Sequence, residues 1–208
     1  MNLKNYNSFL KTLNLLFYGL LIVVGIIFLL MIASLMGVLI SSPNKIYNLI
    51  NKGQLFTSLQ IYGLELHFNE KVVNNFIYDQ KIIYTLLLIG ILYSIVIFTI
   101  IFFTRKLVKS IVCKDIFTIT NSKRISLISY GFIFLSLTLH SMESYLFYAF
   151  SKLFQLNSFL ENTDWVDSTT YHVFGIQWSL LLAGIIIWTI SKVFKYGCFL
   201  QEEYDNTI

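Results

Sequence analysis

Four separate stretches of the 208-residue chain are apolar over the length that a helix needs to cross a lipid bilayer. They cover approximately residues 13–40, 82–103, 125–150 and 174–190. The hydrocarbon core of a bilayer is about 30 Å thick and is crossed by roughly 20 helical residues. Because each stretch is too long and too apolar for a buried strand, we interpret all four as transmembrane helices. The sequence therefore predicts an all-α integral membrane protein, a single domain built as a four-helix transmembrane bundle.

The charged and aromatic residues agree with this class. Only 12% of the residues are charged, whereas an average soluble domain has about a quarter. Aromatic residues make up 17% of the chain, which suits a protein with several lipid–water interfaces. This composition indicates that the surrounding solvent is a membrane.

Lysine and arginine are unevenly divided between the two sides of the predicted membrane. Five lie in the two loops of residues 41–81 and 151–173. The other ten lie outside those loops: Lys4, Lys11, Arg105, Lys106, Lys109, Lys114, Lys123, Arg124, Lys192 and Lys195. Because positive loop residues stay in the cytoplasm, we expect both termini, the inner loop 104–124 and the tail 191–208 there. This topology accounts for the net charge of +4, so no direct binding of nucleic acid is expected.

The outer loop 41–81 contains an alternating segment, SLQIYGLELHF, at residues 58–68. Apolar and polar residues alternate on both sides of Gly63, a pattern typical of a strand with a glycine bulge. The second outer loop contains TTYHVF at residues 169–174, which also has the composition of a strand. A small β element that pairs the two segments is one expectation, and an amphipathic surface segment is the alternative.

The inner loop is the most basic part of the sequence. Its TRKLVKSIVCKDIFTITNSKR segment has six basic residues and one acid, Asp115. Thr118 or Thr120 is expected to cap the third helix, because a threonine hydroxyl can accept a bond from a free backbone N–H. The basic residues are expected to attract anionic membrane lipid. The alternative is that they only fix the orientation of the chain.

Two ionisable residues, His140 and Glu143, lie well inside the third apolar stretch. Their spacing of i, i+3 places them on one helix face, together with Ser136 and Ser144. Charged groups inside a membrane often carry function, so these two are candidates for a metal site, a proton relay or a solute site. Snorkelling and hydrogen bonding within the protein are the alternative roles.

Other familiar sites are missing from the sequence. Cys113 and Cys198 form no CxxC or His–Cys cluster, and such a cluster is needed for a zinc site. No phosphate-binding loop, zinc-protease helix or nucleophile elbow occurs either. We therefore expect no cofactor, no metal beyond the weak candidates His140 and Glu143, and no enzymatic activity.

Two cytoplasmic segments resemble a known family. The tail FKYGCFLQEEYDNTI is similar to a family pattern F-x-x-G-x-x-L-Q-x-E-x-D-L-T-I, with Asn206 in place of its last leucine. The matching residues are Phe194, Gly197, Leu200, Gln201, Glu203, Asp205, Thr207 and Ile208. The segment KDIFTITNSKRI is similar to a second pattern, G-x-P-F-T-x-x-N-x-K-R-L, but has Lys114 and Ile116 in place of its glycine and proline. The residues that match here are Phe117, Thr118, Asn121, Lys123 and Arg124.

The family is one of small bacterial four-span membrane proteins described only as a domain of unknown function. Its genes often lie beside a gene for a helix-turn-helix regulator of the Cro/repressor type. The resemblance therefore implies a multi-pass protein of the bacterial cytoplasmic (inner) membrane that is paired with, or controlled by, a cytoplasmic regulator. A homo-oligomer also remains open.

The inner loop is basic and the tail is acidic, so the two could dock against each other through Lys123 or Arg124 and Glu203 or Asp205. We interpret the tail as a docking element for the inner loop or for a partner protein, and the matching residues of both segments as candidate interaction residues. The first function hypothesis is a regulatory membrane protein with a soluble partner. The alternatives are a transport or immunity protein for a small or lipophilic solute using His140 and Glu143, and an intramembrane enzyme.

Overall fold

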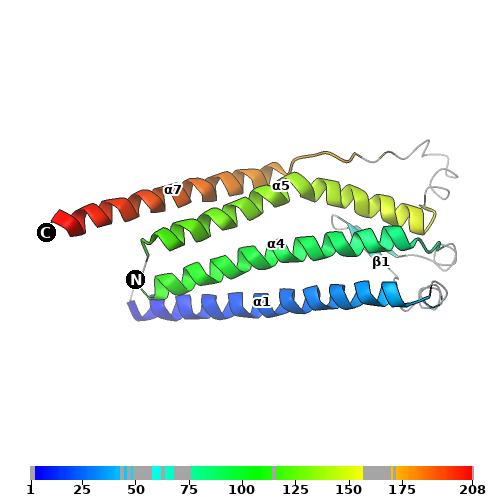
Figure 1. Cartoon of the computed structure of the whole chain (residues 1–208), viewed down its shortest axis with the longest axis horizontal. Helices are drawn as coiled ribbons and strands as arrows, with labels where there is room; N and C mark the ends of the chain where they lie inside the picture. Colours follow the sequence, from blue (N-terminus) through cyan, green and yellow to red (C-terminus); the bar gives the residue numbers. More distant parts are fainter. Residues whose placement is uncertain are drawn as a thin grey trace. The chain divides into compact units, whose positions relative to one another are not determined.

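The computed structural model describes residues 3–42, 45, 48, 58–61, 64–67, 76–113, 116–156, 170 and 172–207. These residues contain four helices that are long and apolar enough to cross a membrane. The helices are α1 (Leu3–Ile40), α4 (Gln80–Val112), α5 (Ile119–Leu153) and α7 (Trp178–Thr207) (Figure 1). The predicted class, an all-α multi-pass membrane protein with four spans, is therefore confirmed.

Each helix extends beyond at least one end of the apolar stretch that predicts it. Helix α7 begins at Trp178, four residues after the expected start at residue 174, and continues through the tail to Thr207. Lys192 and Lys195 consequently lie inside this helix, well before its end at Thr207. The tail has no proline that would stop the helix.

The helices contribute to two compact units. One unit consists of Met1–Leu30, Ile91–His140 and Gly175–Ile208. The other consists of Met31–Gly90 and Ser141–Phe174. We call them the terminal unit, because it holds both chain ends, and the loop unit, because it holds both predicted outer loops.

The loop unit has its own apolar core, where the end of α5 meets the start of α4. Phe76, Ile82, Ala149, Leu153 and Phe154 are buried together. The rings of Phe76 and Phe154 lie 5.3 Å apart, and the backbone N–H of Ile77 donates to the Leu153 carbonyl at 2.7 Å. This core joins the two segments by packing as well as by hydrogen bonding.

Side-chain and backbone geometry define both helix ends at this core. The Asp79 carboxylate accepts bonds from the backbone N–H groups of Lys81 (2.9 Å) and Ile82 (3.3 Å), so Asp79 caps α4. Helix α5 ends at Leu153. Gln155 follows with a φ of 51°, the left-handed conformation that commonly terminates a helix.

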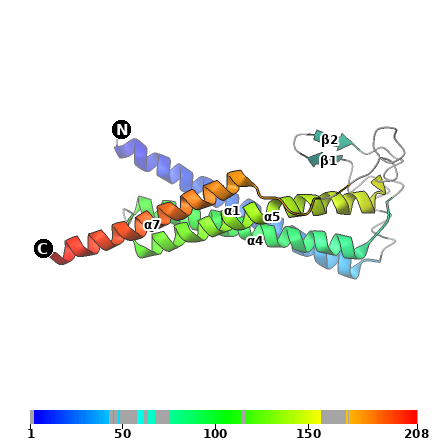
Figure 2. The ribbon, with the colours of Figure 1, turned by 90° about the horizontal axis from the view of Figure 1, so that it is seen from above.

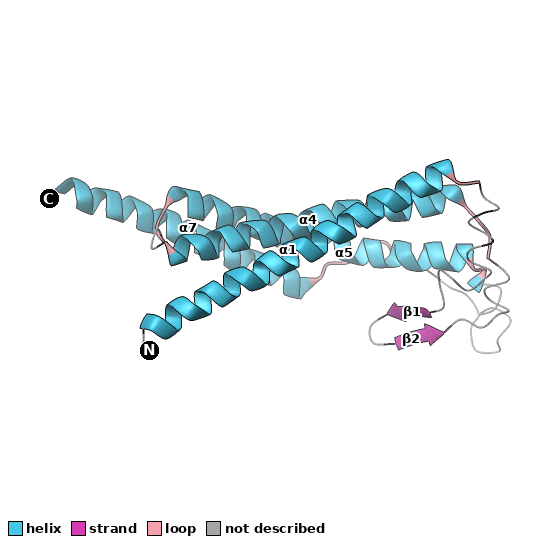
Figure 3. Ribbon diagram, turned by 90° about the horizontal axis from the view of Figure 1, so that it is seen from below, coloured by secondary structure: helices cyan, strands magenta, loops and turns pink. Residues whose placement is uncertain are grey.

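The alternating segment of the first outer loop forms a β-hairpin. Strand β1 (Ser58–Ile61) pairs antiparallel with β2 (Leu64–His67), with Ile61 opposite Leu64 and Ser58 opposite His67 (Figure 3). A β element is therefore present in the first outer loop, but it is a hairpin within that loop, so the expected single strand with a glycine bulge is wrong. The expected pairing with the second outer loop is not found among the described residues. Among the described residues of the second outer loop, 170 and 172–174 are not in a strand.

Small residues let the helices of the terminal unit approach closely, as is common between transmembrane helices. A Cβ atom on Gly131 of α5 would lie 2.6 Å from the Ile100 side chain of α4. A Cβ atom on Gly184 of α7 would lie 2.8 Å from the Ile133 side chain and 3.2 Å from its backbone nitrogen. Glycine is thus required where α5 meets each of these two neighbours.

We predict that Gly184→Ala destabilises the protein by about 1–3 kcal/mol, because the added methyl group pushes α7 away from α5. Gly19→Ala is the matched control, since a Cβ atom there would have no neighbour within 4 Å. Alanine also favours the helix over glycine, so the control is expected to be as stable as the parent or slightly more stable. Thermal unfolding in detergent micelles measures the difference, and equal shifts for both variants would contradict the close contact.

Candidate functional site

The connection between α4 and α5, which we call the inner turn, is described at Cys113 and at residues 116–118, and it leads into α5 through a threonine cap. The Thr118 hydroxyl accepts a bond from the Asn121 backbone N–H at 3.1 Å. The Thr118 carbonyl accepts bonds from the N–H groups of Asn121 (3.0 Å) and Ser122 (3.1 Å). The predicted cap is confirmed, and it belongs to Thr118 rather than to Thr120, which lies inside the helix.

Asn121 holds the inner turn together. Its side chain is 0% exposed, and its amide nitrogen donates to the Ser110 hydroxyl of α4 (2.7 Å) and to the Ile116 carbonyl (2.9 Å). Its amide oxygen accepts a bond from Arg124 at 2.9 Å. Arg124 also reaches the Lys106 carbonyl at 3.4 Å. These contacts give Asn121 and Arg124 a structural role in joining α4 to α5.

Phe117 brings the inner turn into contact with the tail helix. Its ring centroid lies 5.3 Å from that of Phe194. A Cβ atom on Gly197 would lie 3.0 Å from the Phe117 ring, so glycine leaves room for the aromatic side chain. The two segments that carry the family resemblance therefore meet through an aromatic contact.

Aromatic packing joins these two segments, and the expected ionic docking stays a prediction, because the Asp205 side chain lies outside the described part of the structure. Arg124 bonds to Asn121 and Lys106 as above, and Lys123 is exposed and lines a groove with Lys192 and Lys195. Exposed ion pairs contribute at most about 1 kcal/mol, whereas an aromatic contact also removes apolar surface from water, here only in part because Phe117 is 49% exposed.

The tail continues α7 beyond the inner turn (Figure 2). Leu200, Gln201 and Glu203 are exposed on it. Asp205 and Thr207 belong to the same helix, but their side chains, like residue Ile208, lie outside the described part of the structure. The tail thus presents a helical surface to its surroundings.

Serine hydroxyl groups that were not among the predicted site residues connect α5 to α7. The Ser126 and Ser191 hydroxyls lie 2.6 Å apart, and Ser122 and Ser191 each donate to the other's carbonyl at 2.9 Å. Ser129 donates to the Gly184 carbonyl at 2.9 Å. All these groups lie at helix positions, so the bonds are direct contacts between two helices.

A sequence signal for this contact exists. Ser122, Ser126, Ser129 and Ser136 are separated by four, three and seven residues, the spacing of one helix face. Such a line of hydroxyls inside an apolar stretch indicates a helix–helix contact. Ser191 stands alone in the sequence and gives no comparable signal.

His140 serves as a packing group. Its ring lies against Gly175, where a Cβ atom would be 2.5 Å from the ring. Nearby, the Gln177 backbone N–H donates to the Ser136 carbonyl at 2.9 Å. Both contacts hold the chain that enters α7 against α5.

Glu143 lies in the loop unit, whereas His140 belongs to the terminal unit. Near Glu143 on α5, Ser141 donates to the Val173 carbonyl at 2.6 Å, and Ser144 donates to the His172 carbonyl. Among the described residues, no group of three or more His, Cys, Asp or Glu side chains is placed to hold a metal ion. A metal, proton or solute role for His140 and Glu143 stays a prediction.

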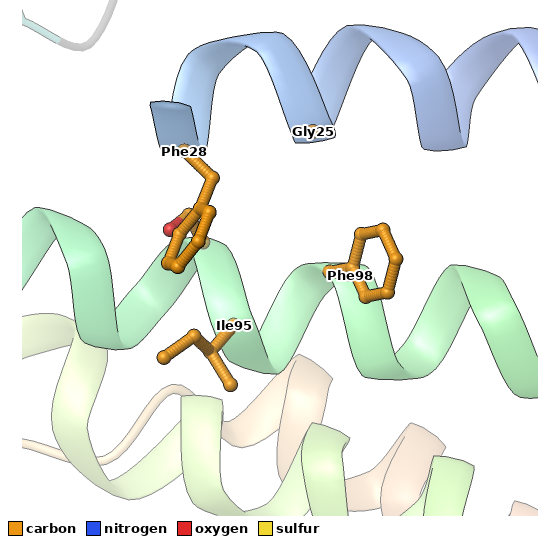
Figure 4. A pocket seen from close by; sticks show the side chains of 5 residues that line it. Gly25, Phe28, Ile95 and Phe98 are labelled. Carbon is orange, nitrogen blue, oxygen red and sulfur yellow. The ribbon is translucent and has the colours of Figure 1, made fainter. Parts of the chain in front are cut away.

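A small apolar cavity lies between α1 and α4 in the terminal unit. It has a volume of about 160 Å³ and is lined by Gly25, Phe28, Ser94, Ile95 and Phe98 (Figure 4). The Ser94 hydroxyl donates to the Ile91 carbonyl of its own helix. The cavity therefore suits an apolar group such as a lipid chain and has no arrangement for polar chemistry.

The comparison with protein families gives one result. A family with the description "Protein of unknown function (DUF2975)" matches residues 69–208. The chain belongs to this family. The DUF2975 match confirms the predicted resemblance to a domain of unknown function, and the tail pattern and the neighbouring regulator gene stay predictions. Comparisons with curated proteins and with solved structures gave no significant match.

We predict that Asn121→Ala lowers the stability by about 1–3 kcal/mol, because it leaves buried partners of the amide without hydrogen bonds. Asn206→Ala is the control, since Asn206 is exposed on the tail and its loss should change stability little. Thermal unfolding in detergent compares the two, and limited proteolysis should cut the inner turn faster in the first variant. Equal stability and equal cleavage would contradict the structural role of Asn121.

Proposed function

We propose that this DUF2975 protein is a non-enzymatic regulatory protein of the bacterial cytoplasmic membrane, with both termini in the cytoplasm. Its cytoplasmic surface, formed by the inner turn and the tail helix, binds or responds to a soluble partner such as a helix-turn-helix transcriptional regulator. The membrane itself supplies the scaffold that holds this surface in place.

The observation that carries the proposal is an exposed apolar stripe on the tail helix. Val193, Tyr196, Leu200 and Tyr204 are 62%, 63%, 46% and 66% exposed. Their spacing of three, four and four residues places them on one helix face. Most of this stripe follows Lys192 and Lys195, beyond the apolar run that ends at Ile190. A contiguous apolar surface outside the membrane is typical of a protein-binding site.

The inner turn packs on α7 beside the stripe and supports the base of the tail helix. Phe117 packs on Phe194 and Gly197, which fixes the base of the tail helix next to the turn. An amphipathic helix that is already folded and anchored loses less conformational entropy on binding than a free segment would. The arrangement therefore favours docking of a partner on the exposed stripe.

The basic residues support the proposed orientation. Lys11, Arg105, Lys123 and Lys192 each lie at the border of an apolar stretch of a different helix. In the terminal unit Arg105 lies 4.6 Å above the Tyr18 ring and donates to Asn14 at 3.3 Å, an amphipathic arrangement common at membrane interfaces. Positive residues concentrate on the cytoplasmic side.

The two native cysteines provide a test of orientation, because Cys113 is exposed and Cys198 is buried. We predict that a membrane-impermeant maleimide labels Cys113 only after the cells are permeabilised. Thr170→Cys in a Cys113→Ser background is the control, since Thr170 is exposed and its loop is expected outside. Labelling of the control in intact cells and of Cys113 only in permeabilised cells is the expected pattern, and the reverse pattern would refute the orientation.

For the partner, we predict that Glu203→Lys/Asp205→Lys and a chain ending at Phe199 both lose a soluble protein that the full chain retains. The charge reversal replaces two negative side chains on the tail helix with positive ones, and the truncation removes half of the stripe itself. The measurement is affinity purification from crosslinked native membranes, with recovered soluble proteins quantified by mass spectrometry. At least a tenfold loss, about 1.4 kcal/mol, is expected.

Glu65→Lys/Glu70→Lys is the matched control, because it makes the same charge change in the outer loop. It should recover the partner as the unmodified chain does. If all four proteins recover the same soluble material, or none does, the tail acts only as an internal brace for the inner turn and the partner proposal fails.

A further inference from the structure

A groove between α5 and α7 gathers three lysines above a floor of hydroxyl groups. Its volume is about 450 Å³. Lys123, Lys192 and Lys195 line it together with Ser122, Ser126 and Ser191. The described lining residues include no carboxylate. We call this feature the lysine groove.

The serine contacts build the floor and set the spacing of the two helices. Ser126 and Ser191 are joined at 2.6 Å, and Ser122 bonds to the Ser191 carbonyl at 2.9 Å. These short bonds bring Lys123 of α5 onto the same groove as the two lysines of α7. Like charges that share a groove repel one another, and an anion between them would relieve this repulsion.

The groove changes from charged to apolar along α5, and an aromatic ring outside its lining lies beside Lys192 of α7. On α5, Lys123 is followed by Leu127 and Tyr130 at i+4 and i+7 on the same lining. On α7, Lys192 lies 4.9 Å from the ring centre of Trp188, which is one turn nearer the apolar run. Leu127, Tyr130 and Trp188 are 42%, 54% and 40% exposed. This gradient matches a molecule with an anionic head and an apolar chain.

The depth of the lysines is that of a headgroup layer. Lys123 stands just before the apolar stretch of α5, and Lys192 and Lys195 stand just after that of α7. Basic pockets between transmembrane helices at this level bind anionic lipid headgroups. Tyrosine and tryptophan also concentrate at this level of a membrane.

We propose that the lysine groove binds one anionic phospholipid. The three ammonium groups hold the headgroup phosphate, while the serine hydroxyls stay bonded between the two helices, and an acyl chain lies along Leu127 and Tyr130. A bound lipid of this kind joins α5 to α7 near the inner turn. The proposal concerns a lipid and is independent of the soluble partner.

The test uses delipidated full-length protein in a neutral detergent, with lipid binding measured by native mass spectrometry. Phosphatidylglycerol is the probe. Phosphatidylcholine tests whether binding requires a headgroup with a net negative charge, and inorganic phosphate tests whether binding requires an acyl chain. The test variant is Lys123→Gln/Lys192→Gln/Lys195→Gln. Its matched control is Lys11→Gln/Lys106→Gln/Lys109→Gln, which removes three charges elsewhere in the terminal unit.

We expect the unmodified protein and the control to bind phosphatidylglycerol at least tenfold more tightly than phosphatidylcholine. The test variant should lose at least tenfold in phosphatidylglycerol affinity, because each lysine near an anionic lipid contributes on the order of 1 kcal/mol. The variant with all three lysines changed to arginine should retain binding. Equal losses in the test variant and the control would overturn the proposal.

Two other outcomes would also overturn it. Equal affinity for both lipids would show that the charge of the head is irrelevant, and competition by millimolar inorganic phosphate would indicate a free-phosphate site. If the triple variant does not fold, Lys195→Gln alone replaces it, since Lys195 is exposed on the rim. That variant should bind phosphatidylglycerol about threefold more weakly, and unchanged affinity would refute the groove as a lipid site.

Discussion

Hydroxyl groups between α5 and α7 bond to the facing helix, with Ser122 and Ser191 exchanging bonds at 2.9 Å. Lipid chains are as apolar as leucine, so apolar surface alone gives two transmembrane helices little reason to associate. Close packing at Gly184 and these interhelical bonds supply that reason here. The position of α7 on α5 in turn sets the contact of Phe117 with Phe194 and the lysine groove.

The inner turn and the tail have different physical characters although both carry the family resemblance. Thr118, Asn121 and Arg124 are engaged in bonds within the turn, so their identity is explained by folding. Leu200 and Tyr204 are exposed on a helix, where folding gives no reason for an apolar side chain. The exposed apolar stripe of the tail is therefore the observation on which the proposed partner rests.

How far the sequence predicted the site depends on the kind of interaction. The Thr118 cap was predictable, because capping depends on residues only three positions apart. The docking of Lys123 or Arg124 onto the tail as an ion pair stays a prediction, whereas the aromatic packing of Phe117 on the tail helix was not predicted. Net charge of two segments can be read from a sequence, whereas the rotation of each helix, which decides the side chains that meet, cannot.

The sequence by itself determined the four spans, since bilayer thickness sets their length and apolar runs are local. It also determined the β-forming segment of the first outer loop, but not its pairing of Ser58–Ile61 with Leu64–His67. Only the tertiary structure decided that Ser110 meets Asn121, that Ser191 meets Ser122, and that Lys123 shares a groove with Lys192 and Lys195. The physical reason is that helix contacts inside a membrane are made by a few small and polar residues. A hydrophobic period in the sequence does not show which helix such residues contact.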